Sequence, residues 1–407
     1  MSTNLDNYIQ VTLRDGEVAI ERQVFCSLLD LTPIKGYKDY SDALSSGEIS
    51  LAKLKKLAIR ADVPYPLFFA PSSKVAKQVK DLDKNVFDRI PSKREIHLSS
   101  RGSVAIEDIK LIVKDLSRKQ EFLKNRLITS APKNSYLGLI AKDAKGGTSV
   151  QALAESIRGY LGIDLKELRK KSKGKVLAYL TERAEANNIF VAYSSHHYMP
   201  QNLKKTLGMS GLCLKDKFFP IVFINTRDGD ADPRILEATG RQTFTLVTML
   251  VCIALNRFFF SNKDRGTQSP TLSDIYAIAS EVIIPKKDIE NAVVNDLEDL
   301  KQLAQMFKVT PSMCLFRLRE LRLIGKKLAD ELKKQLSEEI KKKGGIPRQP
   351  LPVNGYLKYN GARFSKEVLA AERRRAISLV ELKNVLFRKG KKMDIKLIRD
   401  TRMSVGL

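Results

Sequence analysis

Residues 244–255 read FTLVTMLVCIAL and contain no charged side chain. The apolar run continues toward residue 260 only by passing Thr248, Asn256 and Arg257, so it is too short to span a bilayer. A helix that is apolar on every side has to be covered on every side by protein. This stretch therefore predicts a buried core helix in a globular domain, with no polar group suited to chemistry.

Composition limits the class of protein further. The chain has 407 residues, enough for roughly two or three domains, and its 43% hydrophobic content is typical of a globular protein. Its 72 basic residues exceed its 46 acidic residues, which gives a formal net charge of +26. This excess indicates an acidic partner, most simply nucleic acid and DNA in particular. No basic amphipathic anchor lies beside an apolar span, so we expect no membrane partner.

Cysteine usage and the first residues predict the compartment. Cys26, Cys213, Cys252 and Cys314 are far apart and form no CxxC pair. Isolated thiols are typical of proteins in a reducing cytoplasm. The opening sequence MSTNLDNYIQ lacks the charged start and apolar core of a signal peptide. We therefore expect a cytoplasmic protein; its oligomeric state is not predicted by these features.

Helical and strand patterns divide the chain into four segments. Residues 1–72 are predicted to form a degenerate helix-turn-helix-like domain, whose last helix is capped by Ser50 and carries leucines at helical spacing. Residues 73–135 are predicted to be a helical connector. Residues 136–325 form the predicted core, and residues 326–407 form a basic C-terminal module.

The predicted elements of the remaining chain are mostly helices, with a few short strands in one small sheet. They are a long amphipathic helix at about 103–127, a helix broken at 161–162, a strand at 189–193, a hairpin at 211–225, a helix ended by Pro285, a helix-turn-helix with its turn at 309–311, and a strand at 355–359. The fold class that this pattern predicts is helix-rich α+β.

The order of these elements and several short stretches resemble one known family. SSGEISLAKLKKLAIRADVPYPLFFAP is similar to the end of an N-terminal Xre-type helix-turn-helix domain, and MSGLCLKDKFFPIVFIN resembles the strands before a catalytic helix. SDIYAIASEVIIP, DLKQLAQMFKVTPSMCLFRLRELRLIG and NGARFSKEVLAAERRRAISLVELKNVL resemble the parts that follow that helix. Together they resemble the long members of the ImmA/IrrE metallopeptidase-like family over nearly the whole chain. The resemblance implies a zincin-like core with a small sheet.

The resemblance also implies that the catalytic residues are replaced. The family's helix reads FTLAHELGH, in which two histidines hold zinc and the glutamate is the general base. Thr248, Met249 and Cys252 stand at the positions of the first histidine, the glutamate and the second histidine, and Leu272 stands at the third ligand. The core is therefore expected to be an inactive pseudopeptidase without metal or cofactor.

One alternative keeps a zinc site with non-standard ligands. Its candidate ligands are Cys252, Asp274 and one of the two histidines His196 and His197, which adjoin a predicted strand. Neighbouring residues of a strand point to opposite faces, so at most one of these histidines would face the site.

Basic residues predict where nucleic acid binds, because phosphate contacts by Lys and Arg supply affinity. The Xre resemblance places the recognition helix near residues 37–44. The carboxylates of Asp39 and Asp42 in this stretch would repel phosphates. The helix-turn-helix at 300–323 and the basic tail are the other candidates. The predicted DNA-binding residues are Lys53, Lys55, Lys56, Arg60, Arg317, Arg319, Arg322, Arg373, Arg374, Arg375, Lys389, Lys391 and Lys392.

These features predict a non-catalytic regulatory protein that binds DNA. The resemblance implies a transcriptional repressor or an antitoxin-like regulator in a prophage or toxin–antitoxin setting, with a regulatory protein or a toxin as a further partner. Two alternatives stay open: a zinc-dependent endopeptidase of the ImmA/IrrE type that cleaves a regulatory partner, and a protein-interaction scaffold that holds an intact partner in the old substrate cleft.

Overall fold

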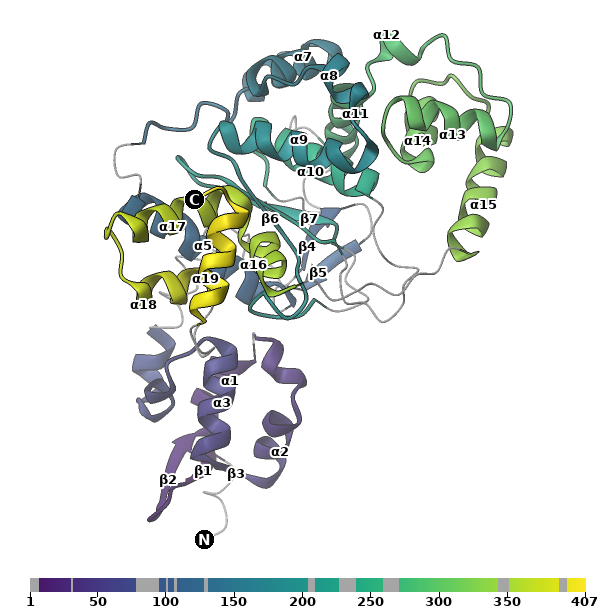
Figure 1. Ribbon diagram of the computed structural model, residues 1–407. Coiled ribbons are helices and arrows are strands. Elements are labelled where there is room, and N and C mark those ends of the chain that lie inside the picture. Colours follow the sequence, from purple (N-terminus) through teal and green to yellow (C-terminus); the bar gives the residue numbers. More distant parts are fainter. Residues whose placement is uncertain are drawn as a thin grey trace. The chain divides into compact units, whose positions relative to one another are not determined.

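The computed structural model describes most of the chain as a helix-rich α+β protein, which confirms the predicted fold class (Figure 1). Among the described residues the strands form two three-stranded sheets and one two-stranded sheet, the last made of β4 (Glu95–Ser99) and β5 (Gly102–Ala105). The described residues are 7–30, 32–77, 95–99, 102–105, 108–127, 131–203, 209–226, 239–258, 271–342, 351–387 and 394–407.

The chain divides into two compact units. The first unit comprises Met1–Ile96, Ser103–Arg118 and Pro200–Leu207, and the second comprises His97–Gly102, Lys119–Met199 and Gly208–Leu407. The predicted domain of residues 1–72 lies within the first unit. The boundaries predicted at residues 72, 135 and 325 stay predictions.

A small mixed sheet forms part of the first unit. β1 (Tyr8–Thr12) pairs antiparallel with β2 (Glu17–Glu21) and parallel with β3 (Glu48–Ser50). The predicted helical N-terminal domain therefore also contains strands, which its sequence pattern did not predict. Ile9 and Val11 are buried at alternate positions of β1, which is the two-residue period of a strand with one face in the core.

Three α-helices and two 3₁₀-helices lie within the described part of residues 22–69 in the first unit. They are α1 (Arg22–Leu29), η2 (Pro33–Gly36), α2 (Lys38–Ser46), α3 (Leu51–Ala61) and η3 (Tyr65–Phe69). The predicted cap is confirmed, because the Ser50 side chain accepts a hydrogen bond from the Lys53 amide. Four apolar residues of α3 at helical spacing enter the core, and they are Leu54, Leu57, Ala58 and Ala61.

The helix predicted at about 103–127 is shorter than expected. It begins at Lys110, because Gly102–Ala105 forms β5, and α5 runs over Lys110–Phe122. A π-helical turn, Leu123–Leu127, follows it. Residues Lys110–Arg118 belong to the first unit and the rest of α5 to the second.

The core of the second unit is built around α10 (Thr239–Ala254). This helix contacts α9 (Lys173–Ala186), α11 (Leu272–Ile283), β7 (Gly211–Leu214) and β8 (Ile221–Ile224), and its residues from Thr245 to Ala254 are all buried (Figure 1). The prediction of a buried core helix is confirmed. Each large aliphatic side chain buried in this way contributes about 1.5–3 kcal/mol to stability.

The sheet beside α10 has the order β6-β8-β7. β6 (Phe190–Tyr193) and β8 run parallel, whereas β7 and β8 are antiparallel, as the predicted hairpin requires. All residues of β7 and β8 are buried. Strands covered on both faces read as continuous apolar runs, which is why GLCL and IVFI were recognisable.

The remaining helices of the second unit surround this core. They are α6 (Ala141–Lys145), α7 (Val150–Leu161), α8 (Leu165–Lys170), α12 (Lys286–Ile289), α13 (Leu297–Met306), α14 (Pro311–Glu320), α15 (Lys326–Lys342), α16 (Pro352–Asn360), α17 (Ala362–Arg373), α18 (Leu379–Leu382) with the π-helical turn Lys383–Phe387, and α19 (Ile395–Ser404). The predicted helix break at Gly162 and the turn between α13 and α14 are confirmed.

The strand predicted at 355–359 is wrong, because these residues lie in α16. Pro352 occupies the first turn of this helix, where its missing N–H costs nothing. Tyr356 and Tyr359, three residues apart, are both buried, which is the spacing of a helix and not of a strand.

Gly361 joins α16 to α17 at a close approach to β6. It has a φ of 83°, and a Cβ atom there would lie 2.4 Å from the carbonyl oxygen of Val191. Only glycine combines this backbone conformation with this contact.

We therefore expect Gly361→Ala to lower the free energy of unfolding by more than about 1 kcal/mol, because the added methyl group meets backbone and the φ is unfavourable. Urea denaturation measures this. Gly174→Ala is the matched control, since a Cβ at Gly174 of α9 meets nothing within 4 Å. The control should be neutral or stabilising by up to about 1 kcal/mol. Equal losses in both variants would contradict the account.

Candidate nucleic-acid interface

The positions of α10 that the family resemblance aligns with zinc ligands carry side chains that do not fit zinc. Thr248, Met249 and Cys252 are all buried. The Thr248 hydroxyl donates a hydrogen bond of 2.8 Å to the carbonyl oxygen of Phe244 in its own helix. Met249 offers only a thioether, and the hydroxyl of Thr248 is hydrogen-bonded to its own helix. This face of α10 therefore lacks the donor set of a catalytic zinc site.

Cys252 lies beside a second thiol. Cys213 of β7 shares a side-chain hydrogen bond with Cys252; this bond and burial raise the pKa of Cys213 well above its ordinary value. Zinc binds thiolates, and a thiol that stays protonated is a poor ligand. The two cysteines therefore act as small apolar residues between α10 and the sheet.

The other candidate ligands do not gather at Cys252. Leu272 is the first residue of α11, and Asp274 is exposed, where its carboxylate accepts a hydrogen bond of 2.7 Å from the Thr271 amide in a capping box. His196 and His197 lie in a turn after β6, with ring centroids 3.8 Å apart. The prediction that they point to opposite faces of a strand is wrong, because the strand ends at Tyr193 and His197 has a φ of 68°.

No group of three or more His, Cys, Asp and Glu side chains that could hold a metal ion is found within the described ranges. The same residues include no helix with the length and apolar character needed to cross a membrane.

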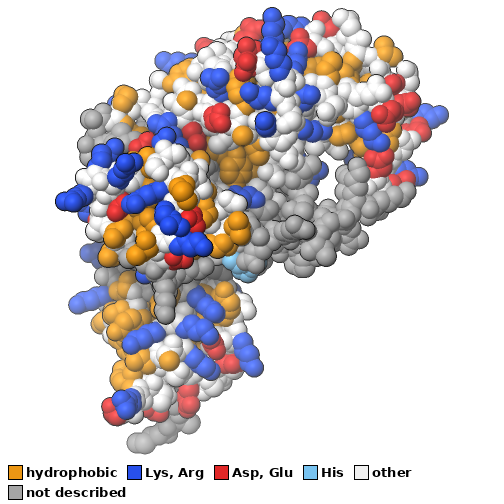
Figure 2. Space-filling model, viewed as in Figure 1, with side chains coloured by type: hydrophobic (Ala, Val, Ile, Leu, Met, Phe, Trp, Pro, Cys, Tyr) orange, Lys and Arg blue, Asp and Glu red, His pale blue; other side chains and the backbone are white. Residues whose placement is uncertain are grey.

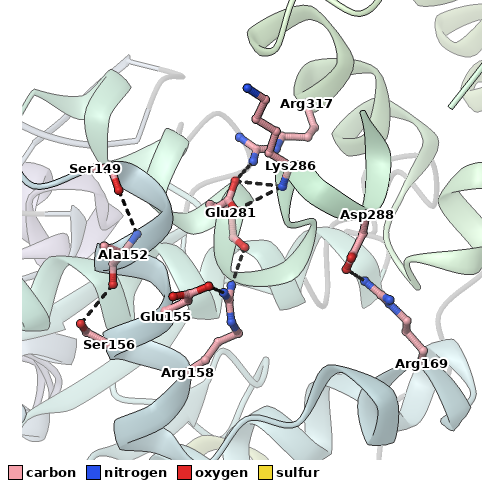
Figure 3. A network of polar contacts seen from close by, with 10 residues as sticks. All are labelled: Ser149, Ala152, Glu155, Ser156, Arg158, Arg169, Glu281, Lys286, Asp288 and Arg317. Atoms are coloured by element: carbon pink, nitrogen blue, oxygen red, sulfur yellow. Dashed lines mark hydrogen bonds and ion pairs between the residues drawn. The ribbon is translucent and has the colours of Figure 1, made fainter. Parts of the chain in front are cut away.

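Arg317 was predicted to contact DNA, and the structure contradicts this. Its side chain is 1% exposed, forms an ion pair with the buried Glu281, and donates a hydrogen bond of 3.1 Å to the carbonyl oxygen of Ile284 (Figure 3). Glu281 also accepts hydrogen bonds of 3.1 and 3.2 Å from the amide of Lys286. Arg317 therefore joins α14 to α11 and cannot reach a phosphate from this position.

Further arginines extend this network between helices. Arg158 of α7 donates a hydrogen bond of 2.7 Å to the carbonyl oxygen of Glu281. Arg169 of α8 forms an ion pair with Asp288 of α12, and its guanidinium lies 5.1 Å from the ring centroid of Phe307 (Figure 3). Basic residues of the second unit thus serve in part to hold its helices together.

Glu185 is a second buried charge-bearing group. Burial raises its pKa to about 7, and backbone hydrogen bonds from Val191 and Arg363 oppose this shift. Its Oε1 lies 3.5 Å from the position that a Cβ of Gly361 would take. The carboxyl group thus lies between the end of α9, the strand β6 and the start of α17, which gives it a structural setting.

The remaining predicted contacts of the second unit lie on its surface. Arg319 is 44% exposed and pairs with Asp330 at 3.7 Å. The other described members are exposed residues at or just after helix ends, namely Arg322, Arg373, Arg374 and Arg375. Lys389, Lys391 and Lys392 lie outside the described residues.

The predicted contacts on α3 lie together on one helix. Its sequence, LAKLKKLAIRA, contains four basic residues and no acidic one. Lys53, Lys56 and Arg60 are exposed and have the i, i+3, i+7 spacing of one helix face, while Lys55 is half-buried. Lys53 is 55% exposed and lies 3.8 Å from Asp39 of α2. In Figure 2 blue Lys and Arg side chains and orange hydrophobic side chains lie next to one another on the first unit.

Two tyrosines flank this face, and the sequence analysis did not predict them. The guanidinium of Arg60 lies 5.0 Å from the ring centroid of Tyr37, and the ammonium of Lys55 lies 4.8 Å from that of Tyr65. The two rings remain 40% and 41% exposed. We define the α3 surface as Ala52, Lys53, Lys56, Ile59 and Arg60 with Tyr37 and Tyr65. The signal that could have found it is a basic helix with a tyrosine in the segments before and after it, although Tyr37 is separated from α3 by α2 and β3.

Comparison with protein-family models, with curated proteins and with solved structures found no match. The resemblance to the ImmA/IrrE family therefore stays a prediction.

We expect Arg317→Met to lower the free energy of unfolding by about 3–5 kcal/mol, because it leaves the buried Glu281 without its cationic partner. Chemical denaturation of the full chain measures the loss. Arg319→Met on the same helix is the matched control, since Arg319 is 44% exposed and a surface change costs at most about 0.5 kcal/mol. Equal stability of the two variants would show that Arg317 is not part of the core.

Glu185 predicts a pH dependence of stability. Its folded pKa of about 7 is above the ordinary value of 4.5, so its contribution is fully present below pH 4.5 and is lost as the pH rises through 7. In the wild type the free energy of unfolding should fall by on the order of 2–3 kcal/mol between pH 5 and pH 8, and Glu185→Gln should remove this fall. Denaturation at both pH values measures it, with Glu182→Gln on the exposed side of α9 as control. A wild-type pH dependence that survives in Glu185→Gln would contradict this assignment.

Proposed function

We propose that this protein is a non-catalytic regulatory protein that binds nucleic acid, DNA in the first place, through the α3 surface of its first unit. The observation that carries the proposal is a helix face with Lys53, Lys56 and Arg60 exposed, no acidic residue on the helix, and two exposed tyrosines beside it. The formal net charge of +26 supports an acidic partner for the chain as a whole.

The physical basis of binding is neutralisation of phosphates. Each Lys or Arg that contacts a phosphate releases condensed counterions, so affinity falls as salt rises. Lys53, Lys56 and Arg60 can contact consecutive phosphates without rearranging the core, because the opposite face of α3 supplies the packing. Asp39 partly neutralises Lys53, which leaves Lys56 and Arg60 as the stronger contacts.

The proposal includes the finer architecture that the family resemblance implies. The order of α9, β6, the β7–β8 hairpin, α10, α11 and the α13–α14 pair supports a degenerate zincin-like core, and the first unit would be its helix-turn-helix-like domain. A regulatory protein or a toxin as a second partner belongs to this proposal. The filled face of α10 disfavours the alternative of a zinc endopeptidase.

We expect the variant Lys53→Ala/Lys56→Ala/Arg60→Ala to bind a labelled 20-base-pair duplex at least about tenfold more weakly than the wild type at 0.1 M salt. The slope of log affinity against log salt should fall by about 2–3, because up to three phosphate contacts are lost. Fluorescence anisotropy over a salt series measures both quantities.

The matched control removes three exposed lysines from the second unit, Lys142→Ala/Lys145→Ala/Lys217→Ala, and changes the net charge equally. An equal loss in the control would show that binding follows total charge and not the α3 surface. Stoichiometric zinc in protein purified without chelator, together with wild-type binding by the α3 variant, would favour the peptidase over this proposal.

A further inference from the structure

The α3 surface includes apolar residues beside its basic ones. Ile59 is 71% exposed on the same helix as the exposed Lys56 and Arg60, and Ala52 is exposed as well. A large aliphatic side chain gains nothing beside a phosphate, but it gains free energy against the flat face of a base. The chemistry of this position fits the bases of a nucleic acid better than its backbone.

The two tyrosines are held in place by cations. Arg60 lies over one face of Tyr37 and Lys55 over one face of Tyr65, and both tyrosines stay about 40% exposed, so a cation–π contact restrains each ring and leaves part of it accessible. Tyr37 follows η2 and precedes α2, whereas Tyr65 begins η3, so the rings come from opposite sides of α3 in the chain. Restrained and exposed rings are stacking platforms for unstacked bases.

A double helix offers this surface its phosphates and base edges but not the faces of its bases. In a duplex the faces of the bases are stacked on one another, and only their edges are accessible in the grooves. Arg60 and the lysines of α3 can reach phosphates and base edges, but Ala52 and Ile59 on the exposed side of the helix form no hydrogen bond to a base edge. A single strand exposes base faces to Tyr37, Ile59 and Tyr65 while its phosphates meet Lys56 and Arg60.

We propose that the α3 surface is a site for single-stranded nucleic acid, with bases stacked on Tyr37 and Tyr65. This inference rests on the proposed function, because it names the form of nucleic acid that the same surface binds. The sugar is not read by any of these contacts, so single-stranded DNA and RNA share the chemistry.

The test measures binding of the full chain to dT20, rU20 and a 20-base-pair duplex at 0.2 M salt. The wild type should bind at least one single strand more tightly than the duplex. Tyr37→Ala/Tyr65→Ala should weaken that binding by about tenfold per tyrosine and the duplex by less than about threefold. The probe with the larger loss identifies the natural sugar. Tyr37→Phe/Tyr65→Phe keeps both rings and should bind as the wild type does.

Tyr8→Ala is the matched control, because Tyr8 is a 40% exposed tyrosine of the same unit that is remote from α3 in the sequence. Circular dichroism confirms that each variant is folded, and Tyr37→Leu/Tyr65→Leu, which removes the rings but keeps apolar bulk, replaces the Ala pair if that pair is not folded. Unchanged single-strand binding by a folded Ala pair, or an equal loss on the duplex, would overturn the inference. If the triple variant of Lys53, Lys56 and Arg60 loses binding in that case, the proposed function stands; if it keeps binding, both fail.

Discussion

The burial of α10 is the constraint on which the second unit depends. Every residue of the helix from Thr245 to Ala254 is buried, and the helix contacts α9, α11, β7 and β8. This whole stretch therefore serves packing. A catalytic metal site needs polar ligands, an open coordination position and a path for substrate. A hydroxyl bonded to its own helix, a thioether and a protonated neighbouring thiol meet none of these needs. The side chains on this face of α10 are buried in packing contacts.

The buried charges of the second unit have the same structural character. Arg317 and Glu281 satisfy each other and nearby backbone groups, which ties α14 to α11, while Glu185 lies where α9, β6 and α17 meet. A charge inside a protein is tolerated only with such partners or after neutralisation. The basic groups of α3 are different, because Lys53, Lys56 and Arg60 are exposed and the opposite face of the helix supplies the packing. Their removal is expected to leave the core of the first unit intact. The proposed binding on this surface and the stability of the core beneath it can therefore be tested by separate mutations.

Much of the fold could be predicted, because the period of apolar residues reports which face is buried. The helix over 51–61 with its Ser50 cap, the break at Gly162 and the hairpin of β7 and β8 all follow from local patterns. The strands β1 and β2 were missed because their alternation is short, and α16 was misread because Tyr356 and Tyr359 suit a strand by composition. The site was predicted in part. Charge alone marked Lys53, Lys56 and Arg60, but it marked Arg317 equally, since burial and ion pairing depend on segments distant in sequence.

The central claim is that nucleic acid binds to the face of α3 with its bases against Tyr37 and Tyr65. The most direct test is photocrosslinking of the full chain to a dT20 strand that carries 5-iodouracil, followed by mass spectrometry of the adducts. The account predicts crosslinked peptides that contain Tyr37 or Tyr65, and their loss in the presence of excess unlabelled strand. Adducts confined to the second unit, with Tyr37 and Tyr65 unmodified, would contradict it.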